Sequence, residues 1–365
     1  MAAIDISPVL KFMVEKNGSD LFFSTGTPIH IDIEGKTVPV NSQVMVPGMV
    51  KEIAYALMTA EQIKEFETNL EMNFAYGRRD FGRFRINVYK QRGEVAMVVR
   101  YIKSEIPSFE SLGLPDVMKE LITRQRGLIL VVGSTGSGKS TSLAAMIDHR
   151  NTTCSGHILM LEDPIEFVHS HKKSVVDQRE VGIDTLSFDN GLKNAMRQAP
   201  DVVLIGEIRD METMKHAIAY SETGHLCLAT LHANNANQAI ERILSFYPSE
   251  AKAGVLLGVS LNLAAIISQR LVPGTKTKRV AAIEVLINTP YVSDLIKKSK
   301  IEEIKEIMGD NRDIGMCTFD QSLFDLYREG RIDEENALAS ADSRNDLSLK
   351  IRFADEGDSS AGFSA

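Results

Sequence analysis

The sequence predicts an α/β protein with a smaller α+β domain at its N-terminus. From residue 117 onward, short apolar runs alternate with segments whose apolar residues recur at helical spacing. Over residues 29–33 and 84–88, by contrast, apolar and polar residues alternate with period two. Strand–helix alternation is typical of a largely parallel sheet covered on both faces. We expect four parts: an N-terminal domain over 1–102, a linker over 103–116, an α/β domain with C-terminal helices over 117–350, and a disordered acidic tail over 351–365.

The elements of the N-terminal domain follow from local signals. Ser7 and Pro8 predict a helix over 7–16 with Ser7 as its cap. Residues 46–69 are expected to be helical, with Thr59 before Glu61 and Gln62 as a cap signal. The expected strands are 29–33, 84–88 and 95–102.

The α/β domain begins with a buried strand at 127–133, and helical spacing of Leu143, Met146 and Ile147 follows it. Three further apolar runs have strand length. They are 157–161, 202–205 and 226–230. Met211, Met214 and Ile218 predict a helix after the run at 202–205.

Composition and charge exclude several classes of protein. Apolar residues make up 44% and charged residues 25% of the 365 residues, as in an ordinary globular protein. The net charge of −8 argues against nucleic acid as the main partner, which would need a dense basic face. The three cysteines are far apart, which argues against a zinc or disulfide framework.

The most apolar stretch, 253–269, falls short of a membrane span, and we expect it to be a buried core helix. The N-terminus lacks the pattern of a secretory signal. A cytoplasmic protein without a membrane span is therefore expected.

Residues 133–141 match the phosphate-loop pattern G-x-x-x-x-G-K-[ST] between a predicted strand and a predicted helix. They are Gly133, Ser134, Thr135, Gly136, Ser137, Gly138, Lys139, Ser140 and Thr141. The glycines let successive backbone N–H groups point at one polyphosphate, and the following helix adds its positive end. Lys139 is expected to reach the β- and γ-phosphates, and Ser140 to offer its hydroxyl to Mg²⁺.

Acidic residues follow two of the other predicted strands. Glu207 comes after 202–205, at the end that lies on the same side of a parallel sheet as the phosphate loop, where it could hold the Mg²⁺ shell or orient water. Glu162, Asp163 and Glu166 form a second cluster, and like charges this close require a metal ion or an arginine.

Two histidines, His225 and His232, bracket the strand at 226–230. Either imidazole could read the γ-phosphate, and both could equally be ordinary core or strand-end histidines.

These segments resemble the four signatures of the secretion superfamily ATPases, in that family's order. They are the Walker A motif at 133–141, the Asp box at 161–166, the Walker B motif at 197–210 and the His box at 223–232. The segment 267–271 fits the downstream helix of the family. Ser19-Asp-Leu and 82–87 resemble the PilT/PilU branch, the type IV pilus retraction ATPases.

Two departures separate the sequence from the retraction motors of this branch. Residues 291–297 read Tyr-Val-Ser-Asp-Leu-Ile-Lys where the branch has Ala-Ile-Arg-Asn-Leu-Ile-Arg, and 20–23 read Asp-Leu-Phe-Phe in place of Asp-Leu-His-Leu. These departures favour the accessory PilU type.

The resemblance implies a PAS-like N-terminal domain joined to a RecA-like ATPase domain, assembled as a homo-hexamer. It implies that ATP and Mg²⁺ bind between the two domains and that turnover moves an inner-membrane pilus platform protein. Glu207 would be the Walker B glutamate, and Glu162 and Glu166 would assist water or metal. The protein would lie in the cytoplasm, peripheral to the inner membrane at the pilus base, acting alone or beside a paralogous retraction ATPase.

The triphosphate keeps excess negative charge, so at least one arginine is expected to touch it. The candidates lie on the predicted N-terminal sheet or flank the Walker B strand. They are Arg83, Arg85, Arg100, Arg197 and Arg209. Each of these arginines, taken alone, could equally be an ordinary solvated charge on a strand or helix.

Three other classes remain as alternatives. A nucleotide-binding regulatory subunit with little turnover would carry the same motifs. A type II secretion or pilus extension ATPase is expected to carry a long N-terminal extension and a four-cysteine insert. A helicase or DNA translocase would need a basic channel.

Overall fold

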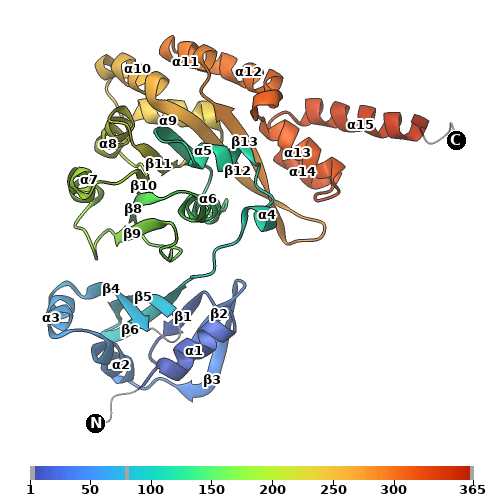
Figure 1. Ribbon diagram of the computed structural model, residues 1–365. Helices are drawn as coiled ribbons and strands as arrows, with labels where there is room; N and C mark the ends of the chain where they lie inside the picture. The colour runs from blue at the N-terminus through green and yellow to red at the C-terminus, as the bar shows by residue number, and fades with distance from the viewer. Residues whose placement is uncertain (1–4, 79–81, 362–365) are drawn as a thin grey trace. The chain divides into compact units, whose positions relative to one another are not determined.

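The computed structural model describes the backbone of residues 5–78 and 82–361 and the side chains of residues 5–77 and 82–354. Its contacts divide the chain into two compact units (Figure 1). The N-terminal unit runs to Glu105 and includes the segments Ile165–Val168 and Gly182–Asp184. The C-terminal unit contains the rest, beginning at Ile106. The two inserted segments come from far along the chain, and no local pattern indicates them.

The N-terminal unit is built on an antiparallel sheet with the strand order β3-β2-β1-β6-β5-β4. The strands are β1 (Asp20–Phe23), β2 (Pro28–Ile33), β3 (Lys36–Val44), β4 (Glu71–Arg78), β5 (Gly82–Gln91) and β6 (Glu94–Ile102). The helices are α1 (Ser7–Glu15), α2 (Met49–Leu57) and α3 (Ala60–Asn69). Helix and strand residues share one apolar cluster, which includes Leu10, Ile53, Phe66, Phe84 and Ile86. The predicted α+β composition is confirmed.

Two details of the predicted helices are wrong. Ile6, not Ser7, is the N-cap of α1, and the Ser7 amide donates to the Asp5 carboxylate instead. The helix expected over 46–69 is two helices, because Thr59 and Gln62 form a reciprocal capping box that starts α3. Strands β1, β3 and β4 were not predicted.

The C-terminal unit contains a second sheet, with the strand order β13-β12-β7-β11-β10-β8-β9. All neighbouring strands are parallel except β12 and β13, which pair antiparallel. The strands are β7 (Gly127–Val132), β8 (Gly156–Glu162), β9 (Ser174–Glu180), β10 (Val202–Ile205), β11 (Leu226–Leu231), β12 (Leu263–Pro273) and β13 (Arg279–Ile287). The largely parallel sheet is therefore confirmed.

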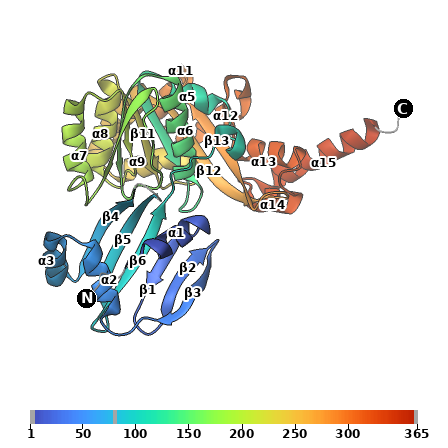
Figure 2. The same cartoon turned by 60° about the horizontal axis from the view of Figure 1, so that its bottom comes forward.

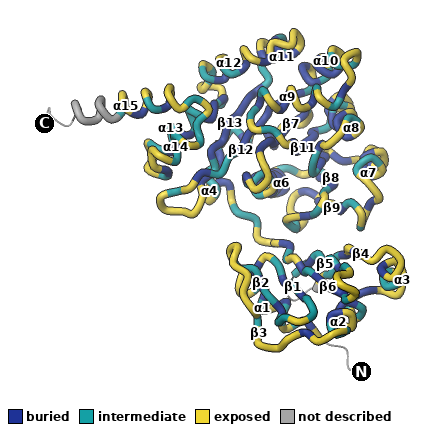
Figure 3. The backbone as a smooth tube through the Cα atoms, turned by 180° about the vertical axis from the view of Figure 1, so that it is seen from behind, coloured by how far each residue is buried: buried dark blue, intermediate teal, exposed yellow. Residues whose placement is uncertain are grey.

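Helices connect and cover these strands. They are α4 (Phe109–Leu112), α5 (Val117–Ile122), α6 (Lys139–Thr153), α7 (Phe188–Ala195), α8 (Met211–Glu222), α9 (Ala236–Ser245), α10 (Lys252–Asn262), α11 (Pro290–Lys297), α12 (Ile304–Asp310), α13 (Phe319–Arg328), α14 (Glu334–Ser340) and α15 (Arg344–Ala361). Every residue of β10 and β11 is buried, so both faces of the sheet are covered at its centre (Figure 3). Within this unit, α13–α15 lie at the β12–β13 side and α7 and α8 at the other (Figure 2).

The apolar stretch 253–269 is not one helix. Helix α10 ends at Asn262 and β12 begins at Leu263, where the Asn288 amide donates to the carbonyls of Ser260 and Leu263. Strand β12 then pairs with β7. The prediction of one helix over this apolar run is therefore wrong, because its second part forms a buried strand of the sheet. The segment 267–271 therefore lies on a strand and not on the expected helix.

Helix α15 extends to Ala361, into the segment 351–365 for which disorder is expected. Leu347 and Ile351 are buried in a cluster with Phe319 and Leu323 of α13, which anchors the helix. Residues 362–365 lie outside the described part. Among the helices of the described residues, none is both long and apolar enough to cross a bilayer.

The first prediction concerns Arg150 of α6, which is buried and donates to the carbonyls of Ile122 and Arg124 at 2.7 and 2.8 Å. Replacing it by methionine leaves these acceptors unsatisfied, so Arg150→Met should lower the free energy of unfolding by about 1–3 kcal/mol. Arg126→Met is the control, because Arg126 is exposed. Equal denaturant midpoints for the two variants would contradict the role of Arg150.

Candidate active site

The loops that leave four neighbouring parallel strands meet at one edge of the C-terminal sheet. In the order β7, β11, β10, β8, these loops begin at Gly133, His232, Gly206 and Asp163. Val132 pairs with Leu231, and Ile205 pairs with both Ala229 and Leu161, so the carboxyl ends are in register. This edge is where ligands bind in open α/β sheets.

The phosphate loop has the backbone that its glycines allow. Gly136 and Gly138 have φ of +77° and +86°, in the left-handed region that favours glycine. A side chain at Gly133 would come within 2.6 Å of the Gln269 carbonyl oxygen. Helix α6 begins directly afterwards at Lys139, so the loop ends on unpaired helical N–H groups, a site that favours anions.

Lys139 places a half-buried ammonium group in this loop. Its Nζ donates to the carbonyls of Gly133 and Ser134 at 2.8 and 2.9 Å. Burial lowers the pKa of Lys139, and the negative charge of Glu207 acts in the opposite direction. A cation held in this way is poised to pair with a polyphosphate.

Glu207 is held between two basic side chains. Its Oε2 accepts from Arg209 Nε at 2.7 Å, and its Oε1 lies 3.2 Å from His232 Nε2. The hydrogen bond from Arg209 to this carboxylate raises the pKa of the guanidinium. The Glu207 carboxylate is thus fixed in direction at the end of β10.

The members of the acidic cluster are divided between the two units. Arg209 also contacts Asp163 at 3.4 Å, so the cation expected for the cluster is an arginine. Glu162 accepts from the Gln178 amide at 2.9 Å. Glu166 belongs to the segment Ile165–Val168, which is part of the N-terminal unit.

Known proteins are similar to this chain over most of its length. The family model described as "Type II/IV secretion system protein" matches residues 3–308. The type IV pilus ATPase PilU of Pseudomonas aeruginosa is 50% identical, over 97% of this chain and 93% of its own length. The retraction ATPase PilT of the same organism is 40% identical, over 93% of this chain and 98% of its own length.

This chain belongs to the PilT/PilU family of secretion ATPases. A crystal structure of the pilus retraction motor PilT with bound ADP has the same fold, with a TM-score of 0.88 at 40% identity, covering 95% of this chain and 99% of that one. The predicted family and the P-loop ATPase class are therefore confirmed.

The two histidines of this PilT/PilU-family ATPase lie at opposite ends of β11. The His225 carbonyl accepts from the Gly127 amide, at the start of β7, whereas the phosphate loop follows the end of β7. Six residues of strand correspond to roughly 20 Å. His232, not His225, therefore reaches the site within one chain.

The five candidate arginines lie in different parts of the structure. Arg209 joins the site, whereas Arg197 lies in the turn before β10 and donates to the Lys193 carbonyl. Arg83, Arg85 and Arg100 share one face of the N-terminal sheet, opposite the core, because Arg85 pairs with Arg100 across β5 and β6. Asp20 neutralises Arg100 at 2.8 Å.

Gln269 is a functional residue that the sequence reasoning missed. It is buried on β12, its Nε2 donates to the Ser137 carbonyl at 2.8 Å, and its Oε1 accepts from Ser142 Oγ at 2.7 Å. It therefore holds both the phosphate loop and the first turn of α6. A polar residue inside the apolar run 253–269 was the available signal.

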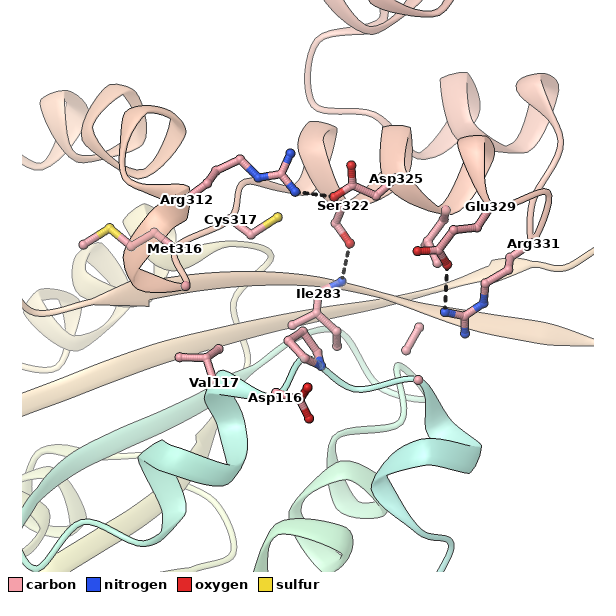
Figure 4. Close-up of a pocket in the computed structure, with 15 residues that line it drawn as sticks. Asp116, Val117, Ile283, Arg312, Met316, Cys317, Ser322, Asp325, Glu329 and Arg331 are labelled. Carbon is pink, nitrogen blue, oxygen red and sulfur yellow. Dashed lines mark hydrogen bonds and ion pairs between the residues drawn. The ribbon is translucent and has the colours of Figure 1, made fainter.

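Two of the cavities formed by described residues of the C-terminal unit are of interest here. One of about 390 Å³ is lined by Gly138 and Thr141, together with Leu112, Leu271 and Arg279, and its size is typical of small-molecule sites. The other, of about 330 Å³, lies between α5, β13 and α13 (Figure 4). Four of its charged side chains form two ion pairs, Arg312 with Asp325 and Arg331 with Glu329. Only the first cavity is lined by residues of the phosphate loop.

Gln269→Leu should weaken nucleotide binding about 10–100-fold, because it removes both hydrogen bonds that hold the phosphate loop. Gln321→Leu is the matched control: its amide donates to the Gly309 carbonyl, beside α13. Calorimetric titration with ADP measures both. Unchanged affinity in Gln269→Leu would show that the loop keeps its shape without this contact.

Proposed function

We propose that this chain is the ATP-hydrolysing subunit of a type IV pilus retraction motor. The observation that carries the proposal is the joint placement of the phosphate loop, Glu207 and His232 at one sheet edge, in a chain similar over nearly its whole length to PilU and PilT. Hydrolysis would drive domain motion, and this motion would retract the pilus.

The triphosphate would bind in the loop 133–141, with backbone N–H groups and Lys139 on its oxygens. The Ser140 hydroxyl and the Glu207 carboxylate are hard oxygen donors of the kind Mg²⁺ prefers, so they fit a metal ion held directly or through water. When bound, Mg²⁺ would neutralise charge on the β- and γ-phosphates.

Glu207 would orient the attacking water. Arg209 donates to this carboxylate and His232 contacts it, which reduces the reorganisation needed for reaction. Glu162 lies at the end of the adjacent strand β8 and would support the same water network. The base would occupy the cavity next to Thr141, between the side chains of Leu112 and Leu271.

Arg83 and Arg85 are the proposed arginines that meet the triphosphate of a neighbouring copy. An arginine supplied in this way is worth about 10³–10⁵ in rate in other phosphoryl-transfer enzymes. This proposal requires a ring, and the family resemblance implies six copies.

The proposed working place is the cytoplasmic face of the inner membrane, against the pilus platform protein. The accessory role beside a paralogous retraction ATPase is supported by the 50% identity to PilU, compared with 40% to PilT. A regulatory subunit with little turnover remains the second candidate, because it would carry the same motifs. Measured ATP turnover separates the two.

Glu207→Gln should keep nucleotide affinity and lower turnover by at least roughly 100-fold, because the amide cannot act as the carboxylate does toward water. Steady-state phosphate release and nucleotide titration measure the two effects. Glu212→Gln, on the exposed face of α8, is the control. Normal turnover in Glu207→Gln would move the catalytic role to another residue.

Mixing two inactive variants tests the arginines. Chains carrying Arg83→Ala and Arg85→Ala keep an intact phosphate loop, whereas Lys139→Ala chains keep both arginines. Rings that contain both kinds should recover part of the ATPase activity, whereas each kind alone stays inactive. Arg92→Ala, exposed in the N-terminal unit, controls for loss of surface charge. An absence of recovery at every mixing ratio would place the arginines in the same chain as the loop.

A further inference from the structure

A buried carboxylate lies behind the loop that carries His232. Glu284 of β13 is 2% exposed, and its Oε1 accepts hydrogen bonds from the Ala236 amide at 2.8 Å and from Ser268 Oγ at 2.9 Å. Ser268 lies directly opposite on β12. Ala236 is the first residue of α9, four positions after His232. Glu284 therefore holds the end of the loop 232–236.

The hydrogen bond from the Ala236 amide to Glu284 gives a partner to one of the first N–H groups of α9. The first N–H groups of a helix have no partner within it. The Asn235 side chain accepts from the Gln238 amide, and Glu284 accepts from the Ala236 amide. The start of α9 is thus held by its own N-cap, Asn235, and by Glu284 of β13.

Arg270 holds the same loop at a second point. It follows Ser268 by two residues on β12, and its Nη2 donates to the Asn234 carbonyl at 3.4 Å. The guanidinium is itself fixed: it stacks 3.9 Å from the Phe319 ring centre and pairs with Asp342 at 2.6 Å. The loop is therefore fastened at Asn234 and Ala236 to one pair of strands.

Keeping a carboxylate here is unfavourable for stability. Burial raises the pKa of Glu284 to about 7, although the Ala236 and Ser268 hydrogen bonds act in the opposite direction. A protein is often at least as stable when a buried charged side chain is replaced by an apolar one of similar volume. The retained acid is therefore consistent with a role beyond packing.

We propose that Glu284 is a positioning residue for ATP hydrolysis, which fixes the loop 232–236 through Ala236 and so sets His232 against Glu207. The contact that it controls is the 3.2 Å pair between His232 Nε2 and Glu207 Oε1. The inference rests on the proposed roles of His232 and Glu207. The phosphate loop is held separately, by Gln269.

The proposal predicts a loss in kcat without a loss in nucleotide binding. In the full-length protein, Glu284→Ala should lower kcat roughly 10–100-fold, as expected for a misplaced catalytic group. The Kd of this variant for ADP should stay within about threefold of that of the unmodified protein, which is a smaller change than the tenfold that corresponds to 1.4 kcal/mol of binding free energy. Glu284→Gln keeps an acceptor oxygen and should restore most of the rate.

Two further variants guard against a general loss of structure. Asn151→Ala removes another fully buried polar side chain, which hydrogen-bonds to the Ser170 carbonyl and the Lys172 amide and not to the His232 loop. The kcat of this variant should therefore stay near that of the unmodified protein. If Glu284→Ala fails to fold, Ser268→Ala removes one of the two hydrogen bonds to the acid and should show a smaller fall in kcat with unchanged ADP affinity. Equal falls in kcat for Ser268→Ala and Asn151→Ala would overturn the proposal.

A double-mutant cycle identifies the route of the effect. If Glu284 acts through His232, then adding Glu284→Ala to His232→Ala should cause no further loss of kcat. A multiplicative loss would overturn the positioning role. Normal turnover in His232→Ala alone would instead contradict the proposed role of that histidine. Normal turnover in Glu284→Ala, with a defective His232→Ala, would contradict the positioning role alone.

Discussion

The half-buried ammonium group of Lys139 is the interaction on which the rest of the site depends. It lies at the start of α6 among backbone carbonyls of its own loop, where burial disfavours its charge. A polyphosphate would add negative charge next to this ammonium group. Strands β12 and β11 flank β7: β12 contributes Gln269, which holds the phosphate loop, and β11 is followed by His232, which contacts Glu207 in the loop after β10.

Strand β12 connects the two halves of the site. Its consecutive residues Ser268, Gln269 and Arg270 contact Glu284, the phosphate loop and the Asn234 carbonyl. Successive residues of a strand point to opposite faces, so one short segment reaches both loops. Arg270 also joins this strand to the C-terminal helices through Asp342 and the Ser340 carbonyl.

Local motifs were predictable from the sequence, and contacts between distant segments were not. The phosphate loop, Glu207 and four of the parallel strands, β7, β8, β10 and β11, carry short-range signals that the sequence analysis used, whereas β9 was not predicted. The stretch 253–269 was misread because an apolar run does not distinguish a buried helix from a buried strand. His232 could have been separated from His225, since only the residue after a parallel strand lies at the edge of the phosphate loop. Gln269 and Glu284 were missed because their partners are far along the chain.

Calorimetric titration of Mg²⁺ and ATP into the intact chain and into Lys139→Ala tests the central claim most directly. The account predicts heat from one site per chain, and an affinity at least about 10–100-fold weaker in the variant, since a charge-assisted contact is lost. Equal affinity in the two proteins, or no binding to the intact chain, would contradict it.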